Sequence, residues 1–284
     1  MMKHTLAATA AAAANVAALL GASPAAASAW THGQGDGQVI LTGVYSHSDK
    51  GFNADGKIIQ IPDYDKEELY LLVEYGVTDE LTIIVNPSLR HVGIEDDPDE
   101  TSGFGYTELG ARYRLAAGDS WVFSAQGSAR IPGERRRDSL AQVGSTDAEY
   151  DLRLLGGSGF QLGGMDAFVD VQAGYRLRDG DPPNEFRLDT TIGIRPAEKV
   201  QLLAQLFNTF SDGAGEGVFP SYRYHNAYLS AVYDLDENWS LQLAGLATLG
   251  GENALRERGL MAGVWYRFGA SVRQSGPPPA FVAP

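Results

Sequence analysis

The stretch at residues 70–87, YLLVEYGVTDELTIIVNP, decides the fold of this chain. Apolar and polar side chains alternate along two runs that flank residues 76–80 (GVTDE). One face of the pair carries Leu69, Leu71, Val73, Tyr75, Leu81, Ile83 and Val85, and the other carries Glu68, Tyr70, Leu72, Glu74, Thr82, Ile84, Asn86, Ser88 and Arg90. A period of two with one apolar and one polar face is typical of a strand between two different media. The short turn predicts an antiparallel hairpin.

The same alternating unit recurs along the chain up to Phe268. Beside the hairpin, alternating runs occupy residues 37–48, 104–115, 121–131, 148–160, 167–177, 186–195, 200–210, 222–235, 239–249 and 260–268. Residues 49–66 are polar and contain Gly51, Asn53, Gly56 and Pro62, so we expect a long loop there. The pattern predicts an all-β chain of about twelve strands.

The connections between these runs alternate between short turns and longer loops that are charged or rich in glycine. Bacterial outer-membrane barrels show this asymmetry, with short periplasmic turns, long outer loops and an even number of strands. A soluble β-sandwich would place its charged face in the core, where charges are costly. Aromatic residues beside the short turns fit the girdle of a membrane interface, namely Tyr75, Tyr113, Trp121, Phe160, Tyr233, Trp239 and Phe268. We therefore predict a single antiparallel up-and-down transmembrane β-barrel over residues 30–268.

The first 29 residues predict a secretory signal peptide. Lys3 precedes an apolar, alanine-rich run, and Ala27-Ser28-Ala29 before Trp30 is a small-x-small cleavage site. The alternative is a retained membrane anchor, but the run is short and ends in this processing site. The chain has 0 Cys, so it offers neither a lipid-modifiable cysteine nor a disulfide.

Composition narrows the function classes. Removing residues 1–29 takes away one Lys and no acid from the 22 basic and 36 acidic residues, which leaves 21 against 36 and a net charge of −15. Nucleic-acid binding needs a basic surface, so we expect no nucleic-acid partner. The mean hydropathy of −0.19 suits a soluble protein or a barrel whose alternate residues face inward.

Several stretches resemble a known family. Residues 74–81 (EYGVTDEL), 103–106 (GFGY), 109–115 (LGARYRL), 132–133 (PG) and 263–268 (GVWYRF) resemble outer-membrane barrels of the MetA-pathway of phenol degradation family and barrels called XagA-like. The resemblance covers most of the chain after residue 29. It implies an outer-membrane barrel that passes small aromatic or other hydrophobic nutrients.

Two features depart from that family. Its members often carry Gly-x-Gly-Asp where this chain has Tyr106 after Gly105, and most end on their final aromatic residue. Here residues 269–284 continue past Phe268 and include Pro277-Pro278-Pro279. We expect this segment to be a disordered periplasmic tail.

Charged residues on the inward-facing positions are the candidate site. They are Glu68, Glu74, Arg90, Glu108, Arg112, Arg114, Arg130, Asp151, Arg153, Asp170, Arg176, Arg187, Asp189 and Arg195. They either form a charge ladder that steers a permeating solute or neutralise one another across neighbouring strands and fill the barrel. Twelve strands about 4.8 Å apart and tilted by about 40° give a backbone diameter of roughly 24 Å, which leaves at most about 10 Å between side chains. Such a bore admits a small solute.

Two loops carry secondary candidates. Arg135, Arg136 and Arg137 in a predicted outer loop either bind lipopolysaccharide phosphate, fold inward as an anion filter, or are simply solvated. The acidic loop at residues 95–100 offers clustered carboxylates for divalent cations but lacks regular ligand spacing, which favours a solvated surface.

The sequence predicts neither an enzyme nor a cofactor or metal site. Ser46 and His47 are the nearest approach to a nucleophile and a base, but adjacent strand residues point to opposite faces. His91 and His225 are isolated in the sequence, and we expect no catalytic role for them.

The sequence therefore favours an outer-membrane channel for passive uptake of a small solute, with aromatic or hydrophobic molecules as the candidate class. The alternative is a structural or surface-interaction barrel, related to aggregation or polysaccharide, with a closed lumen. Expected partners are outer-membrane lipid and lipopolysaccharide, the barrel assembly machinery and a small-molecule solute.

Overall fold

A computed structural model describes residues 28–95, 101–133, 147–217 and 219–269. Within these ranges the chain forms thirteen strands, of which β12 is only 2 residues long. The strands are β1 (Gly37–Phe52), β2 (Ile58–Gly76), β3 (Leu81–Ile94), β4 (Thr101–Ala117), β5 (Trp121–Ile131), β6 (Glu149–Leu162), β7 (Met165–Arg178), β8 (Glu185–Ala197), β9 (Val200–Ser211), β10 (Arg223–Asp234), β11 (Trp239–Glu252), β12 (Ala254–Leu255) and β13 (Arg258–Phe268). In the described part of the chain, no helix is long and apolar enough to cross a membrane.

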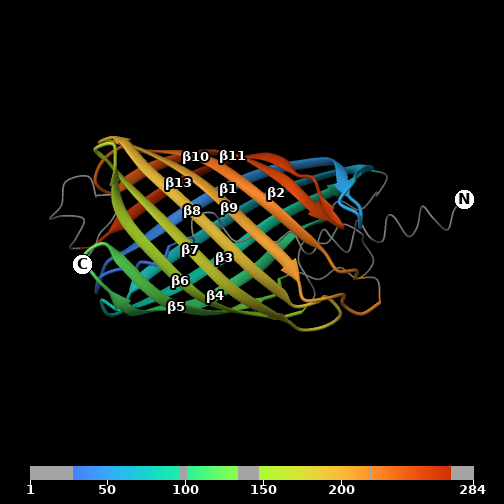
Figure 1. Ribbon diagram of the computed structural model, residues 1–284, viewed down its shortest axis with the longest axis horizontal. Helices are drawn as coiled ribbons and strands as arrows, with labels where there is room; N and C mark the ends of the chain where they lie inside the picture. Colours follow the sequence, from blue (N-terminus) through green and yellow to red (C-terminus); the bar gives the residue numbers. More distant parts are fainter. Residues whose placement is uncertain (1–27, 96–100, 134–146, 218, 270–284) are drawn as a thin grey trace, which may run out of the picture.

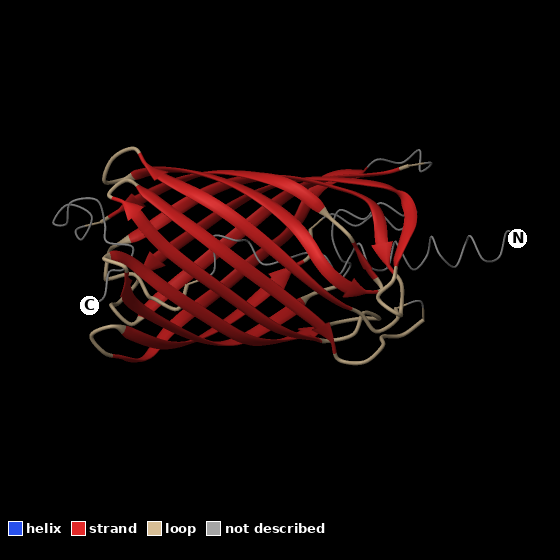
Figure 2. Ribbon diagram, turned by 45° about the horizontal axis from the view of Figure 1, so that its top comes forward, coloured by secondary structure: helices blue, strands red, loops and turns tan. Residues whose placement is uncertain are grey.

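The long strands close into one antiparallel barrel. Each pairs with its neighbours in the chain, and β1 pairs with both β2 and β13, so the sheet has no open edge. The strands run obliquely around a common axis (Figure 1) and enclose it on all sides (Figure 2). The predicted all-β, up-and-down barrel of twelve strands is confirmed.

The outer surface of the barrel is apolar because each strand turns alternate side chains outward. In the hairpin formed by β2 and β3, Leu69, Leu71 and Ile83 are exposed, whereas Leu72, Glu74 and Ile84 are buried. The aromatic residues predicted for the girdle follow the same rule. Except for Phe268, which is half-buried, they are exposed near the short-turn end of the barrel.

The prediction of a long loop over residues 49–66 is wrong. Only residues 53–57 lie outside strands, because β1 continues to Phe52 and β2 begins at Ile58. The ladder between the two strands does not depend on side-chain polarity, and it pairs Lys50 with Gln60 and Gly51 with Ile59. Pro62 falls in the register shift beside Ser48 and Lys50, a position where a strand tolerates a residue without an N–H.

Candidate functional site

The inward-facing candidates lie on the buried side of the barrel wall. All of them are buried except Glu108, Arg114 and Arg195, which are partly buried. Their charges are distributed unevenly, because most of them belong to strands β4 to β8. We call the inward charged side chains of β5 to β8 the charged wall.

Asp151 on β6 is one centre of the charged wall. Its Oδ1 accepts a hydrogen bond from Nε of Arg153 at 2.5 Å, and its Oδ2 accepts one from Nε of Arg176 at 3.0 Å. Arg153 continues the chain of charges by donating from Nη1 to Asp189 on β8 at 2.6 Å. Three strands are thus tied together by alternating charges, which a low-dielectric interior strengthens.

Glu149 at the start of β6 is a second centre. It pairs with Arg130 of β5, and its Oε1 lies 2.9 Å from Nε of Arg178 on β7. Arg178 also donates from Nη1 to the hydroxyl of Tyr222 at 2.9 Å. Glu185 completes this group by accepting from Tyr222 at 2.6 Å.

Three members of this network were not among the sequence candidates, namely Glu149, Arg178 and Glu185. Each lies at the end of a strand. Glu149 fell within the predicted run 148–160, on the face of Asp151, but was not included among the candidates, whereas Arg178 and Glu185 fell outside the predicted runs. Extending the period-two pattern by one step beyond Phe186 would have found Glu185. A strand end inside a barrel is as well paired as its middle, since Glu149 faces Arg178 in the ladder and Glu185 faces Arg176.

Arg187 on β8 is the least satisfied member of the charged wall. Its guanidinium is buried, and none of its three nitrogens has a hydrogen-bond partner within the described residues. Its Nη1 lies 3.7 Å from Oε2 of Glu185, close enough for charge attraction. The charged wall therefore contains the buried guanidinium of Arg187, whose hydrogen-bond donors have no acceptor within the described residues.

The opposite side of the interior contains an apolar cluster among polar side chains. Val44 of β1, Ala244 and Leu246 of β11 and Met261 of β13 form one buried cluster, against which Tyr70 and Tyr228 pack. We call these six residues the apolar wall. Here the inward positions hold side chains that need no counter-charge.

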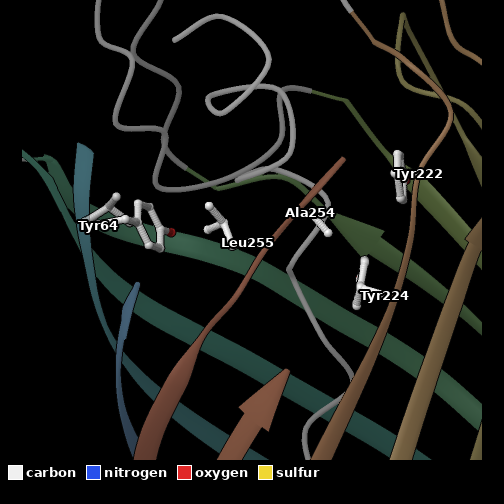
Figure 3. Close-up of a cluster of buried hydrophobic side chains, with 6 residues drawn as sticks. Tyr64, Tyr222, Tyr224, Ala254 and Leu255 are labelled. Atoms are coloured by element: carbon white, nitrogen blue, oxygen red, sulfur yellow. The ribbon is translucent and has the colours of Figure 1, made fainter. Parts of the chain in front are cut away.

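An aromatic cluster lies at the long-loop end of the barrel. Tyr64, Val92, Tyr222, Tyr224, Ala254 and Leu255 are packed together and buried. Figure 3 shows the short strand β12 between Tyr64 on one side and the two tyrosines of β10 and its preceding loop on the other. The strand β12 thus brings Ala254 and Leu255 into the interior.

A smaller ionic group borders the apolar wall. Lys66 of β2 lies 3.0 Å from Glu257 through its Nζ and 3.6 Å from Glu68. Glu68 also pairs with Arg90 of β3 and accepts from the hydroxyl of Tyr70 at 2.5 Å. The predicted candidates Glu68 and Arg90 are therefore partners of each other.

Residues 28–36, before the first strand, run from the barrel interior at Ala29 to the rim at its short-turn end, where Gln34 and Gly35 are exposed. Their backbone follows the turn between β2 and β3, because Gly35 donates to the carbonyl of Gly76 at 2.9 Å and Gly76 donates back to Asp36 at 2.9 Å. The ring of Trp30 meets Phe168 of β7 edge to face, with centroids 6.0 Å apart. A Cβ on Gly157 would lie only 2.5 Å from the Trp30 ring, so a larger residue at that strand position would have to displace the ring.

Two of the predicted candidates hold this N-terminal segment. Arg112 donates from Nη1 to the carbonyl of Trp30 at 2.9 Å and from Nη2 to Glu74 at 2.9 Å. Glu74 also accepts from Gln38 at 2.5 Å and lies 3.2 Å from Nε2 of His32. The position of this segment could not be predicted from the sequence, because residues 30–36 show neither alternation nor a charge pattern.

The remaining candidates lie near the short-turn end or outside the described residues. Arg195 contacts Asp234 at 2.7 Å, and Arg114 lies 3.4 Å from Glu80. Arg135, Arg136 and Arg137 lie outside the described residues, as do residues 96–100 of the acidic loop and residues 270–284 of the tail. Their predicted roles stay predictions.

His47 and Ser46 diverge as expected for adjacent residues of a strand. Nδ1 of His47 lies 3.0 Å from Asp65, whereas Ser46 is buried and donates to Glu257 at 2.9 Å. Within the described residues, no three His, Cys, Asp or Glu side chains gather in a way that would hold a metal ion.

The sequence profile of the family described as "Putative MetA-pathway of phenol degradation" matches residues 25–268. The chain belongs to this family. The match ends at the last residue of β13, so it spans every strand of the barrel. No curated protein matches the chain in sequence.

Solved structures similar to this chain are outer-membrane barrels. The COG4313 outer membrane channel from Pseudomonas putida F1 aligns with a TM-score of 0.72 at 18% identity, covering 87% of this chain and 100% of that one. The beta domain of the Bordetella autotransporter BrkA gives a TM-score of 0.51 at 12% identity, with 84% and 100% covered. The NanC porin gives 0.50 at 9% identity, with 81% and 100% covered. At these identities the likeness shows the fold alone. A closed β-barrel with an apolar outer surface places the protein in the cell outer membrane.

Proposed function

We propose that this protein is an outer-membrane channel for passive uptake of a small solute, with aromatic or hydrophobic molecules as the preferred class. The observation that carries the proposal is the two-sided interior. A charged wall on β5 to β8 faces an apolar wall contributed by β1, β2, β10, β11 and β13. A solute with an apolar body finds contacts on one side, while the other side is compatible with water.

The N-terminal segment supports a narrow channel in this proposal. It lies within the barrel at the short-turn end, which is the periplasmic end in outer-membrane barrels. Trp30 and Phe168 meet there, and Leu203 and Val232 belong to the same buried cluster. A solute leaving toward the periplasm would pass this apolar constriction.

Planar-bilayer recording tests the channel. The purified protein should give small stepwise conductances, and a variant lacking residues 30–34 should give larger ones because the constriction is removed. Replacing Gly157 by Ala should also raise conductance, since the added methyl group displaces the Trp30 ring. Heat-modifiable migration on a gel controls for folding, and folded protein without any conductance over many insertions would refute the proposal.

The solute class needs its own assay. Proteoliposomes should take up a small aromatic compound faster than a sugar of similar mass, and the difference should shrink when Val44 and Met261 of the apolar wall are both replaced by Gln. A channel that conducts ions but takes up both compounds equally would leave the channel proposal standing and overturn its solute class.

A second candidate is a structural or surface-interaction barrel with a closed lumen, related to aggregation or polysaccharide. The filling of the interior by ion pairs, by β12 and by the N-terminal segment favours it. Deleting residues 132–147 separates the two functions. In a channel the deletion changes conductance, whereas in a surface protein it changes adhesion or clumping.

We also propose three partners from the outer surface and the strand ends. The exposed leucines of the strands suit contact with outer-membrane lipid, and the arginines at residues 135–137 suit lipopolysaccharide phosphate. The last strand, ending in Phe268, is a suitable signal for the barrel assembly machinery. A shift in assembly yield on Phe268→Ala would test that last contact.

A further inference from the structure

Asp170 on β7 is a buried acid of the barrel interior that lacks a cation. Its exposed fraction is 0%. It accepts hydrogen bonds from Nε2 of Gln172 at 3.0 Å and from the backbone N–H of Ala29 at 2.5 Å, and it forms no salt bridge within the described residues. A buried carboxylate is stabilised chiefly by an opposite charge, which Asp151 and Asp189 on the same wall possess.

The residues around Asp170 hold the peptide bond between Ala29 and Trp30 on both sides. The hydroxyl of Ser124 donates to the carbonyl of Ala29 at 2.6 Å. Nη1 of Arg112 donates to the carbonyl of Trp30 at 2.9 Å. The methyl group of Ala29 is buried in a cluster with Val122 and Leu155.

That peptide bond is also the one that the sequence predicts to be cleaved. Ala27-Ser28-Ala29 has the small-x-small pattern that a signal peptidase recognises. Hydrolysis adds one water across the bond. Ala29 keeps the new carboxylate and leaves with the signal peptide, while the nitrogen of Trp30 gains protons and becomes an ammonium at neutral pH.

We propose that processing after Ala29 creates the missing cation, and that the α-ammonium of Trp30 then binds Asp170 inside the barrel. The nitrogen of Trp30 lies one residue beyond the N–H that already contacts Asp170, a separation of at most about 3.6 Å along the chain. Removal of Ala29 vacates the space that the ammonium needs, and the hydroxyl of Ser124 becomes a second acceptor.

This inference goes beyond the proposed channel, because it holds whatever solute passes. The ion pair would fix the N-terminal segment in the interior only after the signal peptide has been removed. The mature chain would then carry at its first residue a charge that no side-chain count includes.

Two measurements on the purified outer-membrane protein test the inference. N-terminal sequencing and intact mass should give a chain that begins at Trp30, and a chain that begins upstream would overturn it. An aldehyde reagent selective for α-amines should label the folded protein about tenfold more slowly than the heat-denatured protein, because burial blocks the access of the reagent and the ion pair with Asp170 favours the unreactive ammonium.

Substitutions assign that protection to Asp170. Asp170→Asn should raise the labelling rate of the folded protein toward that of the denatured protein, and Asp170→Glu should keep the rate low. The matched control is Asp166→Asn on the same strand, where the acid contacts Gln161 at the surface, and it should behave as wild type. Equal labelling rates in folded wild type and Asp170→Asn would overturn the pairing. If Asp170→Asn does not assemble, the comparison of folded with denatured wild type still decides whether the amine is buried.

Discussion

The charged wall and the apolar wall occupy the same barrel and have the same strand period, but their inward side chains obey different rules. On β6 the inward Asp151 and Arg153 are each buried against an opposite charge. On β11 and β13 the inward Leu246 and Met261 are buried against other apolar groups. The outward faces of all three strands are apolar alike.

This difference shows that contact with lipid determines the residue types on the outward face of a strand, whereas contacts with other strands determine the residue types on its inward face. A buried charge depends on a particular partner at a particular place, since an unpaired one is strongly destabilising. A buried apolar side chain depends on volume and accepts replacements of similar size. The two walls should therefore respond differently to changes that conserve shape.

The largest effect is expected in the charged wall. Asp151→Asn conserves shape but leaves Arg153 and Arg176 without their shared carboxylate. We expect the free energy of unfolding to fall by about 3–5 kcal/mol, as for other broken buried pairs. Urea titration in lipid vesicles, followed by gel mobility, measures the change. A loss below about 1 kcal/mol would mean that water replaces the pair and that the wall is an open, hydrated surface.

The lipid face should give the next largest effect. Leu154 on β6 is 53% exposed and directly follows the inward Arg153. Leu154→Arg places an arginine, the residue type of inward position 153, on the lipid-facing side of the strand. It should lower the free energy of unfolding by about 2–4 kcal/mol and impair assembly, because an arginine in the bilayer is costly. Leu154→Phe is the matched control and should assemble normally. Equal yields of both variants would contradict the assignment of faces.

The apolar wall should show a smaller effect. Met261→Leu conserves volume and should cost less than about 1.5 kcal/mol. Met261→Gln has nearly the same shape but buries an amide among Val44, Ala244 and Leu246, so it should destabilise the barrel more than Met261→Leu does. The same urea titration compares them. If Met261→Leu were as damaging as Asp151→Asn, the contrast between the walls would disappear.

The smallest effect should come from an ion pair at the long-loop end. Arg223 and Glu252 lie 2.6 Å apart, but both are substantially exposed to solvent. Glu252→Gln should change the unfolding free energy by at most about 1 kcal/mol, and less at high salt, because water and ions screen exposed pairs. Titrations at two salt concentrations provide the measurement. A large loss of unfolding free energy that does not depend on salt would mean that this exposed pair contributes as much to stability as the buried pairs of the charged wall.

Most of the barrel could be predicted from the sequence, because the period of two is a local property. Strand β13 ends at Phe268, where the alternation ends, and the turns at residues 77–80 and 118–120 fall where Gly76 and Gly118 indicated them. The extent of β1 and β2 could not be predicted. Beyond the bilayer both faces of a strand meet water, so polar residues no longer indicate a loop.

The interior was predicted only in part. The inward positions followed from alternation, but their partners come from strands far apart in the chain, as when Arg153 binds Asp189. The N-terminal segment was missed for a related reason. Trp30 and His32 lie where they do because of Arg112, Glu74 and Phe168, and no local pattern encodes those contacts.

The hairpin of β1 and β2 has a practical consequence for work on living cells. These strands are 16 and 19 residues long, whereas β5 and β13 have 11 residues each, about the number that a tilted strand needs to cross the bilayer. The surplus raises one side of the barrel rim above the membrane, with residues 53–57 at its tip. Amides of Asp55 and Lys57 bond to the side chain of Asn53 there, so the tip is compact, and Ala54, Asp55 and Lys57 are exposed. An epitope tag inserted at this tip should be readable by antibodies on intact cells without touching the interior.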